Sequence, residues 1–313
     1  MSGIKWGRGY AGTEDEMVIK IAIVGATGTL GRELVSQFQK NGRAVRALVR
    51  TPDKLAGRLT GESEAVSCDL LTVPQSLLTQ YLKGCDVVIH AATELPPRPN
   101  EQRGSEWEIN NRLRMEGTFK LIESSWRAGI ELYLQSSVVS AYINGGDRWL
   151  DEGTPIDILP GRVMETLAVA DMERRVREIP PQIRWAILRC GTLVGPGTAQ
   201  DRLIGKLRRG EEVVAGDGSH FISPVHVADA ASAFVQASRV KRNRAVFNIV
   251  DEPLRYGVYV DGLADRERLP RPRREGLLPK PVSHRCSNEA ARKELGWFPW
   301  RSFYSPEALA VGM

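Results

Sequence analysis

The chain has 313 residues, 42% of them hydrophobic, and its 43 Lys and Arg residues against 38 Asp and Glu residues leave a formal net charge of +5. This length accommodates one or two domains with a core of ordinary size, and the composition excludes an intrinsically disordered chain. No run of about 18 apolar residues occurs, so we expect no membrane partner, and the small positive excess permits an anionic ligand without indicating one.

Residues 1–17 mix Gly, Lys, Trp, Arg, Glu and Asp without an apolar core, which is not the pattern of a secretory signal. We expect this segment to be a flexible extension. The cysteines are scattered and form no C-x-x-C pair, which is typical of reduced thiols and not of a disulfide framework or a zinc site. The sequence therefore predicts a cytoplasmic protein without a metal centre. The cysteines are Cys68, Cys85, Cys190 and Cys286.

A β-branched segment, residues 18–24, predicts a strand that is buried on both faces. It runs directly into Gly25-Ala26-Thr27-Gly28-Thr29-Leu30-Gly31, and residues 32–38 then carry apolar side chains at helical spacing. Strand, glycine-rich turn and helix is the order that confirms a dinucleotide-binding motif. The first glycine permits the tight turn, the second lets the backbone approach a pyrophosphate, and the third lets the helix pack closely on the strand. We therefore expect the phosphates at the N-terminus of this helix.

Strands and helices continue to alternate up to residue 189. This order predicts an α/β fold of the Rossmann type, which is a doubly wound parallel sheet with helices on both faces. Between residues 93 and 104, prolines and charged residues predict an exposed loop at the carboxyl end of a strand, where such sheets bind ligands. The predicted strands are 44–49, 65–68, 86–92, 132–137 and 185–189, and the predicted helices are 76–82, 107–128 and 164–176.

Beyond residue 190 the pattern loosens into short mixed elements, and the Pro- and Arg-rich segment 269–281 predicts an exposed loop. We therefore expect three parts. Residues 1–17 are the extension and residues 18–189 are the NAD(P)-binding Rossmann domain. Residues 190–313 form a smaller substrate-binding lobe that is partly interleaved with the Rossmann domain.

The end of the second predicted strand bears on the choice of cofactor. An acidic residue there binds the ribose hydroxyls of NAD, whereas arginine accommodates the 2′-phosphate of NADP. The chain reads Val49-Arg50-Thr51-Pro52, with no acid before Asp53. We expect Arg50, together with Arg32 just after the third glycine, to pair with that phosphate by bidentate hydrogen bonds, so NADP is favoured over NAD. The alternative is that Arg50 is a solvated charge at a strand end.

Several further motifs accompany the glycine-rich turn: Cys68-Asp69-Leu70, the segment 84–92, Gly117-Thr118, Ser136-Ser137, Gly195-Pro196-Gly197, the segment 222–229 and Glu294-Leu295-Gly296-Trp297. With these motifs, roughly residues 20–300 resemble the extended or atypical short-chain dehydrogenases/reductases, close to the NAD-dependent epimerase/dehydratase family. The resemblance is more specific for the fold than for the activity.

The resemblance implies the rest of the cofactor site. Asp69 and Leu70 flank the adenine, and Ala91, Ala92 and Thr93 line the sugar-phosphate side of the cofactor. The glycine-rich turn and the residue after it complete the set with Gly25, Thr27, Gly28, Thr29, Leu30, Gly31 and Arg32.

Two hydroxyls are candidate catalytic groups. Ser137 matches the serine or threonine that holds the reacting oxygen of the substrate in such enzymes, and the alternative is a strand-end hydroxyl that caps local backbone. Tyr142 is a candidate proton donor for a reductase, and the alternative is a structural or substrate-contact role.

The chain departs from the resemblance at the catalytic Tyr-x-x-x-Lys motif. In working relatives, a lysine one helical turn later lowers the pKa of the tyrosine, which exchanges a proton with the substrate. The matching positions here are Glu165 and Val169, and no tyrosine lies between Tyr142 and Tyr256. Arg114 stands where the relatives have asparagine. Either the chemistry uses other residues, or the protein binds a dinucleotide without the usual catalysis.

We therefore expect an NADP-dependent oxidoreductase or epimerase-like protein that acts on a carbonyl or a secondary alcohol of a small molecule, with a nucleotide sugar as one candidate. The resemblance also implies a homodimer that forms through the helices after the fourth and fifth strands. The alternative is a non-catalytic dinucleotide-binding sensor, an assembly factor or an RNA-associated protein of the same superfamily. We do not expect a nucleic acid to be the partner of this protein.

Overall fold

The structure is a computed structural model that describes residues 19–95, 107–158, 164–240, 244–276 and 281–302. A seven-stranded sheet forms the larger of two lobes, in the order β12-β7-β5-β4-β1-β2-β3, and all six neighbouring pairs are parallel. The prediction of a Rossmann-type parallel sheet is confirmed. Its strands are β1 (Lys20–Val24), β2 (Ala44–Val49), β3 (Glu64–Ser67), β4 (Val87–His90), β5 (Leu132–Val138), β7 (Arg184–Cys190) and β12 (Ala245–Ile249).

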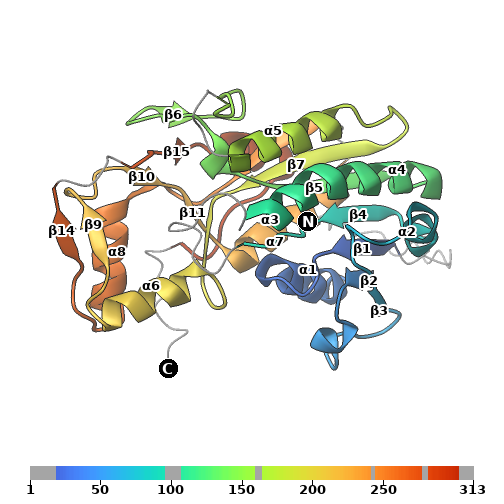
Figure 1. Ribbon diagram of the computed structural model, residues 1–313, viewed down its shortest axis with the longest axis horizontal. Coiled ribbons are helices and arrows are strands. Elements are labelled where there is room, and N and C mark those ends of the chain that lie inside the picture. The colour runs from blue at the N-terminus through green and yellow to red at the C-terminus, as the bar shows by residue number, and fades with distance from the viewer. Residues whose placement is uncertain (1–18, 96–106, 159–163, 241–243, 277–280, 303–313) are drawn as a thin grey trace, which may run out of the picture.

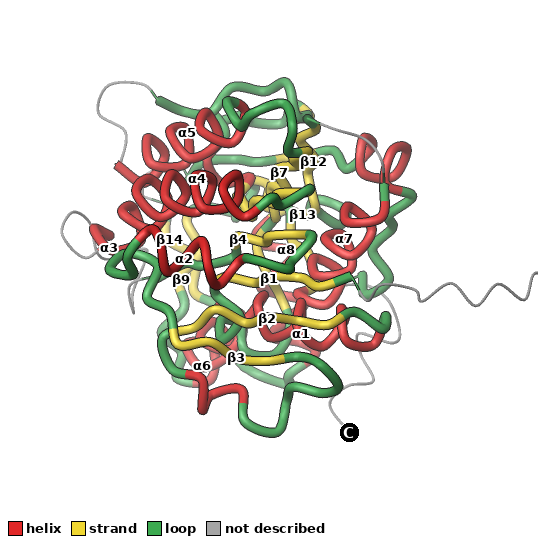
Figure 2. The backbone as a smooth tube through the Cα atoms, turned by 90° about the vertical axis from the view of Figure 1, so that its right-hand side faces the viewer, coloured by secondary structure: helices red, strands yellow, loops and turns green. Residues whose placement is uncertain are grey.

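Helices cover both faces of this sheet (Figure 2). On one face lie α2 (Gln75–Leu82), α4 (Thr118–Ala128) and α5 (Met164–Arg177), and on the other lie α1 (Thr29–Lys40) and α7 (Val227–Arg239). Each face has its own apolar core, one built around Phe38 and Phe234 and the other around Tyr133 and Leu121. Because α7 and β12 come from beyond residue 190, the chain returns from the smaller lobe into the larger one.

The predicted helix 107–128 is interrupted in the structure. It consists of α3 (Glu108–Arg112), a π-helical turn η3 (Leu113–Gly117) and α4. The wider turn brings Gly117 against the sheet, where a Cβ atom would lie 2.8 Å from Cδ2 of Leu70 and 3.8 Å from Nε2 of His90. Such π turns within α-helices are frequent at functional sites. This one lies beside the carboxyl end of β4.

The smaller lobe, at the left of Figure 1, packs α6 (Ala199–Arg208) and α8 (Tyr256–Arg266) around its own apolar core. The loop expected over 269–281 is wrong for residues 273–275, because β14 (Arg273–Glu275) pairs in parallel with β9 (Val213–Ala215). All three residues of β14 are exposed, so no alternation of apolar side chains signals the strand. The other short pairs are β10 (Phe221–Ile222) with β13 (Leu254–Arg255), β8 (Thr192–Val194) with β11 (Pro224–His226), and β6 (Trp149–Leu150) with β15 (Arg285–Cys286).

Short helical turns complete the structure as η1 (Pro52–Leu55), η4 (Val139–Ala141) and η5 (Ala291–Leu295). Across the segments that the structure describes, no helix combines the length and the apolar character needed to cross a membrane.

Candidate functional site

The glycine-rich turn lies at the carboxyl edge of the sheet, between the end of β1 and the start of α1. Gly25 has a φ of +87°, and a Cβ atom on it would lie 2.6 Å from Cα of Ala92. A Cβ atom on Gly31 would lie 2.1 Å from the carbonyl oxygen of Gly25. Both distances are too short for a side chain, so glycine is required at both positions. The turn therefore exposes bare backbone beside the segment that follows β4.

The start of α1 provides donors for an anion. Gly28 is its N-cap residue, no side chain caps the helix, and no acidic residue lies in its first turn. The N–H groups of a helix's first turn lack intrahelical acceptors and carry partial positive charge. The donors and the glycine cradle fit the pyrophosphate of a dinucleotide, so the residues present can hold the cofactor that the fold implies.

The smaller lobe meets this turn directly. Oγ1 of Thr29 donates a hydrogen bond of 2.7 Å to the carbonyl oxygen of Gly197, which lies in the loop after β8. The contact joins residues 168 positions apart in the sequence. The glycine-rich turn is thus one of the places where the two lobes come together, as expected of a site shared by a cofactor and a substrate.

Arg50 follows β2 directly and has a partner that the sequence did not reveal. Its Nη2 donates to Oε2 of Glu94 at 2.6 Å, and the N–H of Glu94 donates to Oδ1 of Asn110 at 3.2 Å. Since β1 lies between β2 and β4 in the sheet, the ion pair crosses from one side of the glycine-rich turn to the other. Both side chains are well exposed.

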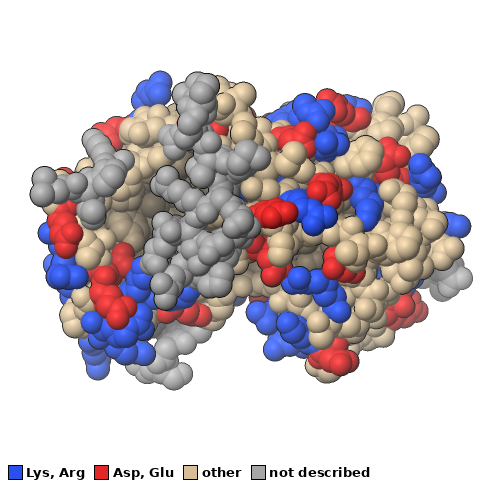
Figure 3. All heavy atoms as spheres, in the orientation of Figure 1, with Lys and Arg blue, Asp and Glu red and all other residues tan. Residues whose placement is uncertain are grey.

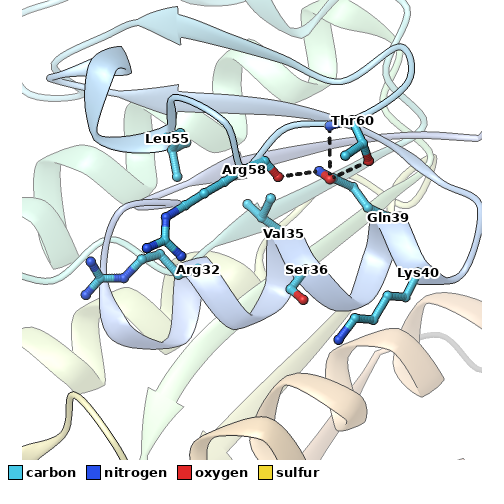
Figure 4. A pocket seen from close by; sticks show the side chains of 8 residues that line it. All are labelled: Arg32, Val35, Ser36, Gln39, Lys40, Leu55, Arg58 and Thr60. Carbon is cyan, nitrogen blue, oxygen red and sulfur yellow. Dashed lines mark hydrogen bonds between the residues drawn. The ribbon is translucent and has the colours of Figure 1, made fainter.

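Arg32 lines a pocket between α1 and the segment after β2, and Arg58 lines the same pocket (Figure 4). The pocket has a volume of about 380 Å³. Sequence reasoning missed Arg58, because it lies well beyond the strand-end position that usually decides cofactor choice.

The other residues expected to bind the cofactor lie along the same edge. Asp69 and Leu70 follow β3, where Oδ1 of Asp69 accepts the N–H of Leu71 at 3.0 Å. The N–H of Ala91 donates to the carbonyl oxygen of Val24 at 2.9 Å, so the segment from Ala91 to Thr93 lies beside the glycine-rich turn. The structure thus brings the expected residues together, and their contacts with a cofactor stay predictions.

Ser137 and Tyr142 both belong to one buried hydrogen-bonded network, which we call the Glu173 network. Oγ of Ser137 donates to Oε1 of Glu173 at 2.7 Å. Arg189 donates to the same carboxylate through Nε at 2.8 Å and through Nη2 at 2.6 Å. Oη of Tyr142 accepts from Nη1 of Arg189 at 2.7 Å and donates to Oδ1 of Asn248 at 2.7 Å. The network consists of Ser137, Tyr142, Glu173, Arg189 and Asn248.

The electrostatics of the Glu173 network favour fixed protonation states. Burial raises the pKa of Glu173, but hydrogen bonds and charge from Arg189, helped by Ser137 and Arg177, outweigh it and leave the pKa below its ordinary value. Burial raises the pKa of Tyr142 far above its ordinary value, although Arg189 acts in the opposite direction. Catalytic acids work best with a pKa near the working pH. Both hydroxyls are engaged by side chains of the network, Ser137 by a carboxylate and not by local backbone, and their catalytic roles stay predictions.

The positions that match the missing Tyr-x-x-x-Lys motif lie on α5. Val169 is buried in an apolar cluster with Ala141 and Met172, and Val138 packs against that cluster. The side chain of Glu165 lies outside the described residues. The position of the motif's lysine therefore carries an apolar side chain, and Val169 is surrounded by apolar atoms.

Two further polar residues lie nearby. His90 is buried, and its Nδ1 contacts Nε2 of Gln135 at 2.9 Å. Burial, with a smaller contribution from the charge of Arg114, lowers the pKa of His90 to about 4, so His90 is neutral near pH 7. Within the described segments, no three His, Cys, Asp or Glu side chains gather as a metal site.

Comparisons with known proteins agree with the Rossmann-type fold of this chain. A model of the NAD dependent epimerase/dehydratase family matches residues 21–250. The 3-diazoavenalumate denitrifying reductase of a Streptomyces species is 30% identical over 314 residues, which cover 90% of this chain and 98% of that protein. The photosystem II assembly factor Ycf39 of Guillardia theta is 30% identical over 123 residues, which cover 39% of this chain and 35% of that protein. The solved structure of MoeE5 in complex with UDP-glucose and NAD has a TM-score of 0.77 at 25% identity and covers 93% of this chain and 96% of its own.

Proposed function

The chain belongs to the NAD dependent epimerase/dehydratase family, and from that premise we propose that it is an NADP-dependent reductase that works without a side-chain acid of the tyrosine type. The observation that carries the proposal is a contrast between the cofactor-binding turn and the candidate catalytic residues. The glycine cradle for a dinucleotide is intact, whereas Ser137 and Tyr142 are both engaged in the Glu173 network. We infer that the protein keeps the means to hold a hydride donor and uses no phenol to protonate the product.

A bound nicotinamide cofactor supplies a hydride. The chain's own residues position that cofactor through the glycine-rich turn and the N-terminus of α1. At the carboxyl end of β5, Ala141 and Val169 are buried in an apolar cluster against which Val138 packs, and none of these side chains can donate a proton.

The lack of a side-chain acid limits the class of substrate. Hydride addition to a simple ketone creates negative charge on oxygen, which catalysis must neutralise with a proton or a strong hydrogen bond. An acceptor that is conjugated or positively charged spreads or cancels that charge by itself. We therefore propose a substrate activated in this way, such as a conjugated carbonyl compound or a cationic nitrogen compound. The reductase relative supports this choice, since its name describes the reduction of a diazo compound and it matches nearly the whole of this chain.

The preference for NADP over NAD is supported by the cations at the adenosine side. Arg32 and Arg58 line one pocket beside the start of α1, and Arg50 follows β2 as the sequence predicted. Guanidinium groups match a phosphate monoester by bidentate hydrogen bonds. The family model and MoeE5 carry NAD in their descriptions, so cofactor choice is the first property to measure.

The test is a turnover assay with the full chain and NADPH. The substrate panel contains a simple ketone, UDP-glucose, a conjugated enone and an aryl diazonium ion, and the readout is the loss of reduced-nicotinamide absorbance. We expect turnover of the activated acceptors and none of the ketone or the nucleotide sugar. Tyr142→Phe and Ser137→Ala are then assayed on the acceptor that is turned over, with the unfolding midpoint as the control for folding. A positioned acid contributes about a hundredfold or more, so such a loss of kcat in folded Tyr142→Phe would refute the proposal.

A second candidate is dinucleotide binding without catalysis. It is favoured by the engagement of both hydroxyls and by the similarity to a photosystem II assembly factor, although that similarity covers only 39% of this chain. Tight NADPH binding with no turnover of any acceptor would support it. On the face shown in Figure 3, basic and acidic side chains are interspersed and form no continuous basic track, which gives no support to an RNA partner.

A further inference from the structure

The loop between β8 and α6 extends from the smaller lobe toward α1 (Figure 1). Its backbone is fixed by hydrogen bonds within its own lobe. The N–H of Gly195 donates to Oε1 of Gln200 at 3.0 Å, and Oγ1 of Thr198 donates to the carbonyl oxygen of Gly195 at 2.7 Å. The N–H of Gly197 donates to Oδ2 of Asp201 at 2.8 Å. The loop is therefore tied to the first turn of α6 and forms one unit with it.

The carbonyl oxygen of Gly197 leaves this unit and meets the glycine-rich turn. Gly197 has a φ of +76°, in the left-handed region that favours glycine, and a Cβ atom on it would lie 3.8 Å from Cγ2 of Thr29. Oγ1 of Thr29 donates to that carbonyl oxygen at 2.7 Å. Thr29 is the first residue of α1, directly after the N-cap residue Gly28. One short side chain thus joins the smaller lobe to the turn that would hold the cofactor.

The backbone and the side chain of Thr29 serve different partners. Its N–H lies in the first turn of α1, where such groups lack intrahelical acceptors and can hold a pyrophosphate. Its hydroxyl is engaged by the smaller lobe. The helix α6 then continues from the loop into the apolar core of that lobe, which contains Leu207 and against which Leu203 packs. A shift of the loop therefore shifts the smaller lobe relative to a cofactor on the turn.

We propose that Thr29 is a positioning residue, whose hydroxyl sets the distance between the cofactor and the smaller lobe that we expect to bind the substrate. Hydride transfer requires the reacting atoms to lie about 3–3.5 Å apart, and a misplacement of about 1 Å can cost about a hundredfold in rate. The hydrogen bond from Thr29 to Gly197 narrows the range of lobe positions. The inference rests on the proposed function, because it requires hydride transfer from a cofactor on this turn.

The experiment compares Thr29→Val with Thr29→Ser in the full chain. Valine replaces the hydroxyl of threonine by a methyl group, whereas serine keeps the hydroxyl. Gln37→Met is the matched control, since Nε2 of Gln37, on the same helix, donates a hydrogen bond of 2.7 Å to the carbonyl oxygen of Ala228 within the larger lobe. The unfolding midpoint of each variant shows that it is folded.

The first readout is kinetic, with NADPH and the acceptor of the substrate panel that is turned over. A neutral hydrogen bond contributes a factor of about 2–10, so we expect Thr29→Val to lower kcat by about fivefold. The Kd for NADPH should stay within about twofold of the wild-type value, because the backbone donors of the turn are unchanged. Thr29→Ser and Gln37→Met should both keep kcat within about twofold of the wild type.

The second readout measures the lobe position and needs no turnover. Spin labels are attached to cysteines introduced by Lys40→Cys on α1 and Arg208→Cys on α6, two exposed positions, and the native cysteines are buried. Double electron–electron resonance then gives the distribution of distances between the lobes, in the free protein and with saturating NADPH. We expect a narrow distribution with Thr29 or Thr29→Ser and a broader one with Thr29→Val.

The outcomes separate the two proposals. If the wild type turns over no acceptor, the proposed function is wrong and the role of Thr29 in hydride transfer with it. If the wild type turns over an acceptor and Thr29→Val keeps either its kcat or its narrow distribution, the inference about Thr29 is overturned while the proposed function stands. A loss of NADPH affinity in Thr29→Val also overturns the inference, because Thr29 would then act on the cofactor site itself.

Discussion

Replacing Arg189 by methionine tests whether the Glu173 network is structural. The side chains of Arg189 and Glu173 are 4% and 0% exposed. The substitution removes two hydrogen bonds to Glu173, of 2.8 and 2.6 Å, together with the nearest counter-charge of the carboxylate. It also removes the hydrogen bonds from Nη1 to Oη of Tyr142 and to the carbonyl oxygen of Glu152. Glu173 keeps the hydroxyl of Ser137 and the Nη2 group of Arg177, at 2.7 and 2.9 Å.

Removing one partner of a buried ion pair costs about 3–5 kcal/mol, because it leaves an uncompensated buried charge. Since Glu173 keeps two donors, we expect the free energy of unfolding to fall by about 3 kcal/mol in Arg189→Met. Ser137→Ala removes a single hydrogen bond to a charged group and should cost about 1.5–3 kcal/mol. The double variant Glu173→Gln/Arg189→Met should be more stable than Arg189→Met alone, because a neutral amide leaves no buried charge.

Urea unfolding near neutral pH, followed by circular dichroism and tryptophan fluorescence, measures these differences. Arg174→Met is the control, since it breaks ion pairs on the exposed side of the same helix and should leave the midpoint close to that of the wild type. An Arg189→Met variant within about 1 kcal/mol of the wild type would show that the network does not hold the strand end.

The same network predicts a pH dependence. The pKa of Glu173 is lowered in the folded protein, so its contribution to stability is complete above the ordinary value of 4.5 and is lost as the pH falls through the lower folded value. Arg189→Met should weaken this acid-dependent loss. If the stability of Arg189→Met falls at low pH as steeply as that of the wild type, the loss does not come from the Glu173–Arg189 pair.

Four further predictions follow from single features. Gly31→Ala should abolish NADPH binding or folding, because its Cβ atom would lie 2.1 Å from the carbonyl oxygen of Gly25, whereas the control Gly205→Ala in α6 should titrate like the wild type. The pKa of His90 falls from 6.5 to about 4 on folding, chiefly through burial, so the unfolded chain binds more protons between these two pH values. The stability of the folded protein should therefore fall as the pH drops through this range. In His90→Gln the urea midpoint should depend less steeply on pH, and an unchanged slope would count against this prediction. All four cysteines are buried, so a thiol reagent should label the native protein no faster than it unfolds, and a rapid phase would contradict their placement. Trp126 is 50% exposed on α4, and if the expected homodimer forms through α4 and α5, Trp126→Glu should reduce the molar mass measured by light scattering to that of one chain, with an unchanged dimer as the contrary result.

Local patterns in the sequence predicted most of the larger lobe. The β-branched segment before Gly25 and the helix after Gly31 are read from neighbouring residues, and the structure confirms both. The sequence did not predict β12, because it lies beyond residue 190, where the alternation of strands and helices is no longer regular. Its partner in the sheet is β7, and much of the smaller lobe lies between the two strands in the sequence. The π turn was missed because helical spacing does not report one extra residue in a turn.

The site was predictable where it is local and unpredictable where it is made by distant residues. The glycine cradle is a feature of seven consecutive residues. The Arg50–Glu94 pair joins residues 44 positions apart, and the Ser137–Glu173 hydrogen bond joins residues 36 positions apart. Sequence reasoning found the arginine and the hydroxyl in each case, but only the fold supplies the carboxylates that engage them.

The carboxylate of Glu173 limits the chemistry that can take place at the end of β5. A tyrosine acid needs a neighbouring positive charge that is free to stabilise the phenolate once the proton has left. Here the guanidinium beside Tyr142 is Arg189, and its other nitrogens are already bound to Glu173. A proton leaving Tyr142 would place a second buried anion on the same arginine, at a cost that grows as the network becomes better buried. The contacts that stabilise the end of β5 thus oppose acid catalysis by Tyr142, which is why the proposed function requires a substrate that is already activated.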